Sequence, residues 1–263
     1  MNSSSVPQPA HRPRKPAESD EKTWWDFWNS SYRAEDGKDL TSRELFEHVA
    51  ALVAQVSEPK QCRVLEVACG SGGLSRLFTC GSYHGIDISP AAIEIARSKQ
   101  PDSDPAHPRT YEAADFHDLP IKQGAFDLVI CVDAIVCFRD QELVLRKIAA
   151  SLRPGGKLIV TAVNPFVYNR ISRSAQAPIE NGPVSHWLSR AEFQSLIRRV
   201  GLRTEQFYSI MPRGNRGVLR VVNSPRIARW LGPRLVAPVR RLKEFAGLGQ
   251  YFVVVAQKVE LYS

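Results

Sequence analysis

Short apolar runs alternate with capped or amphipathic segments through the middle of the chain. The apolar runs have the length and bounds of buried strands, and we expect strands at residues 62–68, 83–88, 110–114, 126–132 and 157–163. Segments with helical periodicity or a capping signal lie between them, at residues 74–80, 91–100 and 141–152. Strands that alternate with helices predict a Rossmann-like, doubly wound α/β fold, in which helices cover both faces of a mostly parallel sheet.

The carboxyl-terminal third continues this pattern less regularly. A helix is expected over residues 189–200 and ends at Gly201, a strand follows at 203–209, and a last strand covers 251–257. Together with the central strands, these complete a seven-stranded sheet. We therefore divide the chain into a disordered tail (1–22), an N-terminal helical lid (23–60), a core (61–210), an insertion (211–250), and the last strand with the C-terminus (251–263).

The predicted N-terminal lid begins with an aromatic stripe. Trp24, Trp28 and Tyr32 recur every four residues, so a helix would present them on one face. Two interpretations remain open. Either the stripe packs into the core, or it covers a bound ligand that Tyr32 reaches.

Composition limits the class of protein. Of the 263 residues, 24% are charged, and no apolar run approaches the roughly 18 residues of a membrane-spanning helix. The five cysteines, Cys62, Cys69, Cys80, Cys131 and Cys137, have no spacing typical of a zinc site or a disulfide framework. We therefore expect a cytoplasmic protein with reduced thiols and no bound metal.

The turn after the first strand is rich in glycine. Gly70 and Gly72 allow the backbone to approach a ligand at the carboxyl end of the sheet, where folds of this class bind their ligands. The turn has neither the spacing of a dinucleotide fingerprint nor that of a P-loop. Asp87 ends the second strand and is expected to accept hydrogen bonds from ribose hydroxyls, because Ser89 is the better helix cap.

Acidic residues also mark the third and fourth strands. After the third strand, Asp115 can accept a hydrogen bond from an adenine amino group while Phe116 lies beside the ring. Asp127 begins the fourth strand at the opposite edge of the sheet, and we interpret it as structural. Asp133 follows the same strand and is expected at the mouth of the ligand site.

The order of these motifs is that of a known family. The segments VLEVACGSGGLS, GIDIS, AADFHDLP, FDLVICVDAIVCF and LRPGGKLIVT resemble those of the class I S-adenosylmethionine-dependent methyltransferases, over about residues 25–210. The resemblance implies S-adenosylmethionine as cofactor, with S-adenosylhomocysteine as product. It assigns the methionine end of the cofactor to Glu66, the ribose to Asp87 and the adenine to Asp115. Ala68 stands where the family usually has its first glycine. The full set of expected cofactor-binding residues is Trp28, Tyr32, Glu66, Ala68, Cys69, Gly70, Gly72, Asp87, Ile88, Asp115, Phe116, Cys131 and Asp133.

The resemblance also implies an antiparallel last strand, which would carry residues 211–250 over the active face. Nine basic residues and no acidic residue lie between 211 and 243, whereas the remaining 26 basic and 27 acidic residues nearly cancel. Three interpretations remain open: a solvated face without function, a lid in which Arg213 and Arg216 bind an anionic substrate, or a patch that binds a membrane, a protein or nucleic acid.

Candidates for substrate chemistry lie after the fourth and fifth strands. His186 is the first candidate for a general base, and His117 and Asp133 are further candidates. Tyr168 is expected to shape the substrate pocket. Nucleic acid is disfavoured as a substrate because Asn164-Pro165-Phe166 follows the fifth strand, whereas the similar motif of DNA amino-methylating enzymes follows the fourth.

The sequence thus predicts an enzyme that methylates an oxygen or nitrogen of a small biosynthetic molecule, which is anionic or linked to a carrier or lipid. Two alternatives keep the methyltransferase fold: a non-catalytic subunit that binds a partner through the insertion, or an RNA or protein methyltransferase. A third, an NAD(P)-dependent oxidoreductase, is disfavoured by the spacing of the glycine turn.

Overall fold

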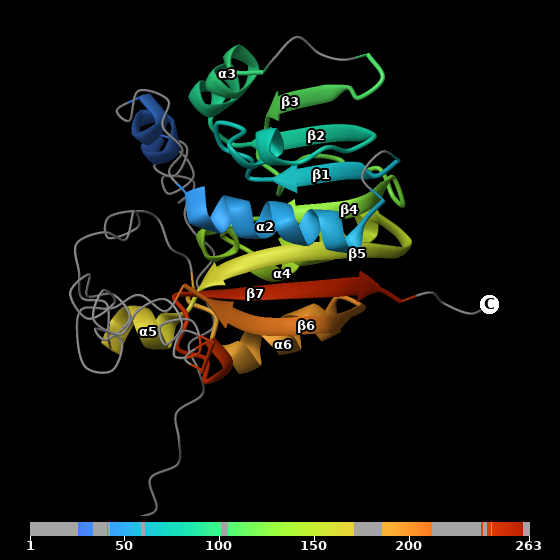
Figure 1. The fold of residues 1–263 in the computed structure, drawn as a ribbon. Coiled ribbons are helices and arrows are strands. Elements are labelled where there is room, and N and C mark those ends of the chain that lie inside the picture. Colours follow the sequence, from blue (N-terminus) through green and yellow to red (C-terminus); the bar gives the residue numbers. More distant parts are fainter. Residues whose placement is uncertain are drawn as a thin grey trace, which may run out of the picture.

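Seven strands form one sheet in the computed structural model, whose described residues are 26–33, 41, 43–58, 61–100, 105–170, 186–211, 238, 241–242 and 244–259. The strands are β1 (Arg63–Val67), β2 (Ser82–Asp87), β3 (Arg109–Ala113), β4 (Phe126–Cys131), β5 (Leu152–Val163), β6 (Leu202–Ile210) and β7 (Tyr251–Lys258). Their order across the sheet is β3-β2-β1-β4-β5-β7-β6 (Figure 1). Strands β1 to β5 are parallel, and β7 is antiparallel to β5 and β6. This topology confirms the predicted fold class.

The helices cover both faces of this sheet. These helices are α2 (Arg43–Val56), α3 (Pro90–Ser98), α4 (Gln141–Ser151) and α6 (Arg190–Arg199), whereas α5 (Pro165–Arg170) lies beyond the carboxyl ends of the strands (Figure 1). Two 3₁₀ turns, η1 (Leu74–Leu77) and η2 (Ile135–Cys137), follow β1 and β4. The predicted cap of α3 is confirmed, because the Ser89 hydroxyl accepts a hydrogen bond from the backbone N–H of Ala92. None of the helices within the described ranges is long and apolar enough to cross a membrane.

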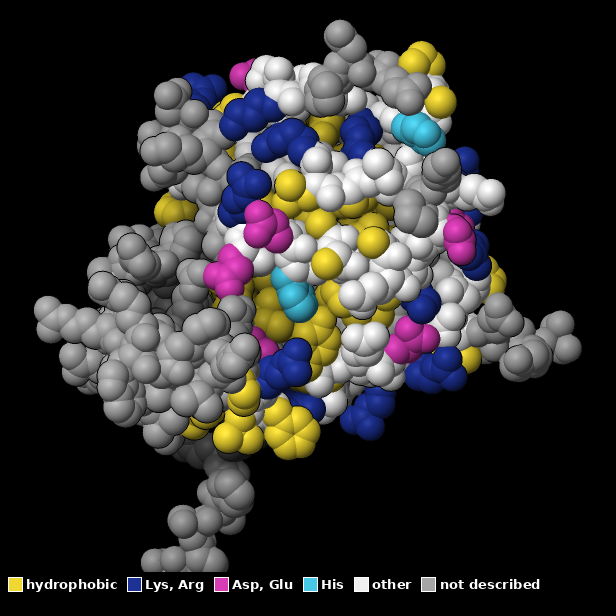
Figure 2. Space-filling view, in the orientation of Figure 1, with side chains coloured by type: hydrophobic (Ala, Val, Ile, Leu, Met, Phe, Trp, Pro, Cys, Tyr) yellow, Lys and Arg dark blue, Asp and Glu magenta, His cyan; other side chains and the backbone are white. Residues whose placement is uncertain are grey.

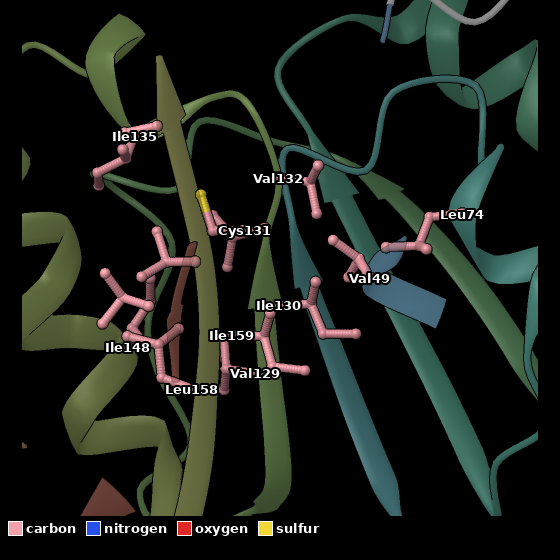
Figure 3. Close-up of a cluster of buried hydrophobic side chains, with 14 of the residues drawn as sticks. Val49, Leu74, Val129, Ile130, Cys131, Val132, Ile135, Ile148, Leu158 and Ile159 are labelled. Carbon is pink, nitrogen blue, oxygen red and sulfur yellow. The ribbon is translucent and has the colours of Figure 1, made fainter. Parts of the chain in front are cut away.

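The core lies on both sides of β4 and β5. Figure 3 shows Ile130 of β4 pointing towards Val49 of α2, whereas Ile148 of α4 lies on the opposite side of the sheet. These side chains are fully buried, as are most of the apolar residues of α2. The segment predicted as part of an N-terminal lid therefore contributes one helix, α2, that is a structural part of the core.

The connection from β1 to β2 differs from its prediction. A helix was expected over residues 74–80, but only the 3₁₀ turn η1 forms there. The chain must return along the full length of β1, about 16 Å, whereas seven residues of α-helix would span only about 10 Å. A short connection between adjacent parallel strands must therefore be more extended than an α-helix.

The Arg-Pro-Gly-Gly run at 153–156 also differs from its prediction. This run lies between the expected helix 141–152 and the expected strand 157–163, but in the structure it belongs to β5. Phe126 pairs with Leu152, and the register then shifts so that Leu128 pairs with Lys157. A bulge therefore absorbs the proline and glycines within the strand, and Gly155 supplies the positive φ of 73° that the bend requires.

The two ends of the 211–250 connection lie together at the carboxyl edge of the sheet. Ile210 ends β6 and is paired with Tyr251, which begins β7. The buried Asn164, which follows β5, donates hydrogen bonds to the carbonyl oxygens of Gly247 and Gly249, both at 2.9 Å. The connection therefore leaves from and returns to the edge where parallel strands of this class bind ligands, as the topology predicted.

Candidate functional site

The glycine turn after β1 is held in a left-handed backbone conformation. Ala68, Gly70 and Gly72 have φ of 59°, 54° and 70°. The Gly70 N–H donates to Oδ2 of Asp87 at 2.8 Å, so the turn is attached to the end of β2. A Cβ on Gly70 would lie 2.3 Å from the hydroxyl oxygen of Tyr32, so a larger residue there would strain the backbone and displace the Tyr32 ring.

Asp87 is a buried carboxylate with hydrogen bonds to both oxygens. Besides the Gly70 bond, its Oδ1 accepts a hydrogen bond from the N–H of Ser89 at 2.9 Å. Burial raises the pKa of Asp87 to about 6, although the two backbone bonds work in the opposite direction. Each carboxylate oxygen can accept a second bond, so Asp87 keeps acceptor capacity towards the pocket that it lines.

Asp115 and its neighbours form a charged group beside this pocket. Its Oδ1 accepts hydrogen bonds from the backbone N–H and the Nδ1 of His117, both at 2.8 Å, and its Oδ2 accepts one from Arg139 at 2.7 Å. Burial works to raise the pKa of Asp115, but the bonds from His117 outweigh it and the pKa is lowered. Phe116 is buried, and the Lys147 ammonium lies 5.6 Å from its ring centroid.

Asp133 follows β4 at the opposite side of the pocket. It has a φ of 56°, and its backbone N–H donates to Oγ1 of Thr161 on β5 at 2.8 Å. Its Oδ2 accepts a long hydrogen bond of 3.4 Å from the hydroxyl of Tyr251, whereas its buried Oδ1 has no hydrogen-bond partner among the described residues. Burial raises the pKa of Asp133 to about 7, against the smaller opposing effect of the Tyr251 bond.

The helical segment 26–33 borders the pocket through Trp28 and Tyr32. Asn29 accepts a hydrogen bond from the backbone N–H of Ala91 at 3.1 Å, and Tyr32 packs against Ala91 and Ala92 at the beginning of α3. Trp28 and Tyr32 both line the pocket, so part of the aromatic stripe covers the site. Trp24 lies outside the described residues.

One pocket brings together eight of the predicted cofactor-binding residues: Trp28, Tyr32, Ala68, Asp87, Ile88, Asp115, Phe116 and Asp133. Sequence reasoning missed most of its other side, which η2 and the residues around it supply. These lining residues are Ala134, Cys137, Phe138 and Arg139, and Thr41 and Ala114 were also missed. The apolar run directly after Asp133, where the chain leaves the sheet, is the sequence signal that could have identified these residues.

The remaining predicted cofactor residues lie beneath the pocket rather than in its wall. Glu66 is buried and accepts a hydrogen bond of 2.6 Å from the hydroxyl of Tyr83, so its carboxylate supports β1 and β2 from within the core. Cys69 and Cys131 are buried free thiols. Gly70 and Gly72 shape the turn without lining the pocket.

The structure brings no predicted substrate residue of the described ranges into this pocket. His186 is exposed, and its Nε2 lies 3.3 Å from Glu192 in the first turn of α6, so the structure does not bring it into the pocket. The imidazole of His186 therefore lies beside the capping box of α6, in which Glu192 also accepts a hydrogen bond from the Ser189 N–H. The side chain of Tyr168, and the residues Arg213 and Arg216, lie outside the described part of the chain.

A second pocket lies between α2 and β6. It is lined by Glu44, His48, Tyr208, Ser209, Ile210, Met211, Arg241, Glu244 and Phe245. Figure 2 shows hydrophobic side chains on this face bordered by histidine, acidic and basic side chains. Ile210 is the sheet partner of Tyr251, whose hydroxyl reaches Asp133, and Tyr251 therefore connects the two pockets.

Known proteins resemble both the sequence and the fold. A family model described as a methyltransferase domain matches residues 65–160. The O-methyltransferase rstn1 of Aspergillus nomiae is 26% identical over 71% of this chain and 81% of its own. The ubiquinone biosynthesis O-methyltransferase of Xanthomonas axonopodis pv. citri is 27% identical over 69% of this chain and 76% of its own.

A solved structure supports the same grouping at the level of the fold. The S-adenosylmethionine-dependent methyltransferase of Mesorhizobium loti has a TM-score of 0.58 and 20% identity, and the match covers 80% of this chain and 97% of that one. The methyltransferase family model spans the region from β1 to β5, which contains the glycine turn, Asp87, Asp115 and Asp133.

Proposed function

We propose that this chain, which is an S-adenosylmethionine-dependent methyltransferase with the class I fold, transfers the methyl group to a hydroxyl oxygen of a small biosynthetic molecule. Methylation of small molecules agrees with the two curated relatives, which are named O-methyltransferases. The observation that carries the choice of oxygen is a pocket in which the half-buried Asp133 lies beside the predicted cofactor residues. A neutral hydroxyl is a poor nucleophile until its proton is removed, so it needs such a group more than an amine does.

The residues of the pocket fit the cofactor. Asp87 retains acceptor capacity for the ribose hydroxyls, and Asp115 with Phe116 offers a carboxylate and a ring for the adenine. The turn at 68–72 allows the backbone to lie close to the ligand. When bound, S-adenosylmethionine supplies an electrophilic methyl group on a sulfonium, and the protein's contribution is to align the acceptor and exclude water.

We further propose that the acceptor carries an anionic group or a lipid-like chain, which the basic 211–243 segment and the second pocket receive. The charge of the segment supports this proposal, because nine basic residues without an acidic one form a strong field for anions. Arg241 and Phe245, which are exposed residues near the end of the segment, line the second pocket and combine a charge with an apolar ring.

A matched panel of acceptors tests the oxygen assignment. Full-length protein would be incubated with S-adenosylmethionine carrying a deuterated methyl group and with catechol, protocatechuate, a long-chain alkylcatechol, or the corresponding diamines. Mass spectrometry would identify the methylated atom. We expect the hydroxyl compounds to be methylated at least about tenfold faster than their diamine counterparts. Transfer to the diamines alone, or to no member of the panel, would contradict the proposal.

Comparison of catechol with protocatechuate in the same panel tests whether the protein recognises an anionic group on the acceptor. Protocatechuate carries a carboxylate that catechol lacks, so it should have the lower KM. Arg213→Glu and Arg216→Glu should raise the KM for protocatechuate and leave the cofactor Kd unchanged, because both act on the acceptor. Equal changes in KM for catechol and protocatechuate would show that the basic segment does not bind the carboxylate.

A further inference from the structure

We propose that Asp133 is a catalytic residue, the general base that receives the proton of the acceptor hydroxyl on its carboxylate. This inference rests on the proposed function, because only a hydroxyl acceptor has to lose a proton on the way to a methyl ether. Asp133 receives this proton from a fixed position at the carboxyl end of β4, in the wall of the pocket that holds the predicted cofactor residues.

The backbone around Asp133 holds the carboxyl in the pocket. A φ of 56° lies in the left-handed region that most residues avoid, at a cost of about 1 kcal/mol. The hydrogen bond from the Asp133 N–H to Thr161 on the neighbouring strand β5 stabilises this conformation. Strained residues that the surrounding structure maintains are concentrated at functional sites.

The carboxyl itself has one empty acceptor position. Its Oδ1 is buried without a hydrogen-bond partner among the described residues, and its Oδ2 has only the long Tyr251 bond. An unsatisfied buried oxygen is costly and is rare in native proteins, so this carboxyl gains stabilisation when a rotation of its side chain turns the oxygen to a donor in the pocket that Asp133 lines. The hydroxyl of a methyl acceptor is such a donor.

The histidines that sequence reasoning offered as bases are occupied or remote. The Nδ1 of His117 is bonded to Asp115, and its Nε2 accepts the backbone N–H of Asp140 at 3.3 Å. Both ring nitrogens of His117 are therefore used to build the adjacent loop. His186 is exposed beside Glu192 and lines neither pocket.

The pKa of Asp133 agrees with the role of a general base. Burial raises the pKa of Asp133 to about 7, so the ionised and protonated forms are both populated at neutral pH, as a general base requires. The titratable or charged groups around it are the thiols of Cys131 and Cys137, the Tyr251 hydroxyl, and, elsewhere in the pocket wall, Asp87, Asp115, His117 and Arg139. The guanidinium of Arg139 is bonded to Asp115.

The proposed step is balanced in atoms and electrons. The acceptor O–H bond breaks and its proton passes to the carboxylate of Asp133. The acceptor oxygen forms a bond to the methyl carbon while the carbon–sulfur bond breaks, and that electron pair remains on sulfur. Asp133 then releases its proton to solvent, so no oxidant, reductant or metal takes part.

One test needs no acceptor. S-adenosylmethionine carries a sulfonium charge that S-adenosylhomocysteine lacks, and a positive charge placed near Asp133 favours its ionised form. Calorimetric titration at about pH 7 in two buffers of different ionisation enthalpy measures the protons released on binding. We expect wild type to release more protons with S-adenosylmethionine than with S-adenosylhomocysteine, by a few tenths of a proton per site. Subtracting the two ligands cancels the contribution of Asp87, which faces the ribose expected in both.

Variants assign that difference to Asp133. Asp133→Asn should abolish it, whereas Asp127→Asn, which removes an acid from the other end of β4, should preserve it. An equal proton release for the two ligands in wild type, or a difference that persists in Asp133→Asn, would overturn the proposal.

The closing test uses the best hydroxyl acceptor of the panel. Asp133→Asn should lower kcat at about pH 7 by at least a hundredfold, the usual contribution of a general base, and leave the cofactor Kd within about twofold. In wild type, kcat should rise with pH and reach a plateau above about pH 7. The pH profile of Asp133→Asn should lack this rise. Asp133→Glu should restore part of the activity.

The outcomes separate the two proposals. If wild type methylates no hydroxyl compound, the proposed function fails and the role of Asp133 fails with it. If wild type methylates hydroxyls and Asp133→Asn does so at a similar rate, or loses cofactor affinity in proportion to its activity, only the assignment of Asp133 is overturned.

Discussion

Two aspartates at opposite ends of β4 have contrasting environments. Asp127, the second residue of the strand, lies between Arg63 and Arg153, with hydrogen bonds of 2.9 Å and 2.5 Å to their Nε atoms. Burial works to raise the pKa of Asp127, but the two guanidinium groups outweigh it and lower the pKa to about 2. The carboxyl of Asp133, just beyond the strand, has only the distant Tyr251 hydroxyl as a partner among the described residues, and burial raises its pKa to about 7.

The contrast extends to the two edges of the sheet. All three non-glycine residues with positive φ in the described ranges, Ala68, Asp133 and Met211, follow strands at the carboxyl edge. Asp87 and Asp133, the two acids whose pKa is raised, lie there as well. At the amino edge, Asp127 joins β1, β4 and β5 through paired charges. One edge therefore stabilises the fold through paired charges, and the other holds strained backbone and acids of raised pKa that a ligand can use.

The largest expected effect on stability comes from Asp133→Asn. Because the folded-state pKa is raised from 3.8 to about 7, the native protein favours the protonated acid, and stability is lost as pH rises between these values. An uncharged asparagine avoids this loss. Chemical denaturation should show the variant more stable than wild type by on the order of 3 kcal/mol at about pH 8, and by much less at about pH 4. Parallel pH profiles for the two proteins would refute the raised pKa.

Asp87→Ala tests the ligand-binding side of the carboxyl edge. Losing a carboxylate that accepts hydrogen bonds from the ribose should weaken S-adenosylmethionine binding more than tenfold, or about 1.4 kcal/mol, by calorimetry. Glu94→Ala is the matched control, because it removes an exposed acid of α3 that does not line the pocket. Unchanged affinity in Asp87→Ala would mean that the ribose binds elsewhere.

Asp127→Asn should have the opposite effect on stability to Asp133→Asn. Its two arginine partners are about half exposed, so solvent screens the ion pairs, and we expect a loss of about 1 to 1.5 kcal/mol at about pH 7. The depressed pKa contributes stability that is present above the unfolded value of 3.8 and lost as pH falls towards about 2. The difference between variant and wild type should therefore vanish in acid. A gain in stability at neutral pH would remove the distinction between the two edges.

The smallest expected effect comes from Ala68→Gly. A φ of 59° is unfavourable for alanine and free of strain for glycine, whereas glycine costs more backbone entropy on folding. The net result should be a stabilisation of about 0.5 to 1 kcal/mol in denaturant titrations. Ala96→Gly, at a helical position of α3, serves as the control and should destabilise the protein. Destabilisation by both changes would show that the turn carries no relievable strain.

Local sequence signals determined most of the fold. Apolar runs, the Ser89 cap and the Gly201 stop depend on neighbours within a few residues, and the structure has each of them near its expected position. The missed helix after β1 has a different cause. Whether residues 74–80 can be helical depends on the distance that the chain must cover back to β2, which no local pattern records.

The candidate site divides in the same way. The glycine turn, Asp87 and Asp115 follow strands, and parallel strands bring their carboxyl ends to one edge, so the sequence alone could group these residues. Only the tertiary structure decided which of the possible bases remains available. His117 is occupied by Asp115 and Asp140, His186 lies beside Glu192, and Asp133 lines the pocket with a partner 118 residues away on β7. Burial and hydrogen-bond partners set the pKa of a carboxyl, and both come from contacts between segments distant in the sequence.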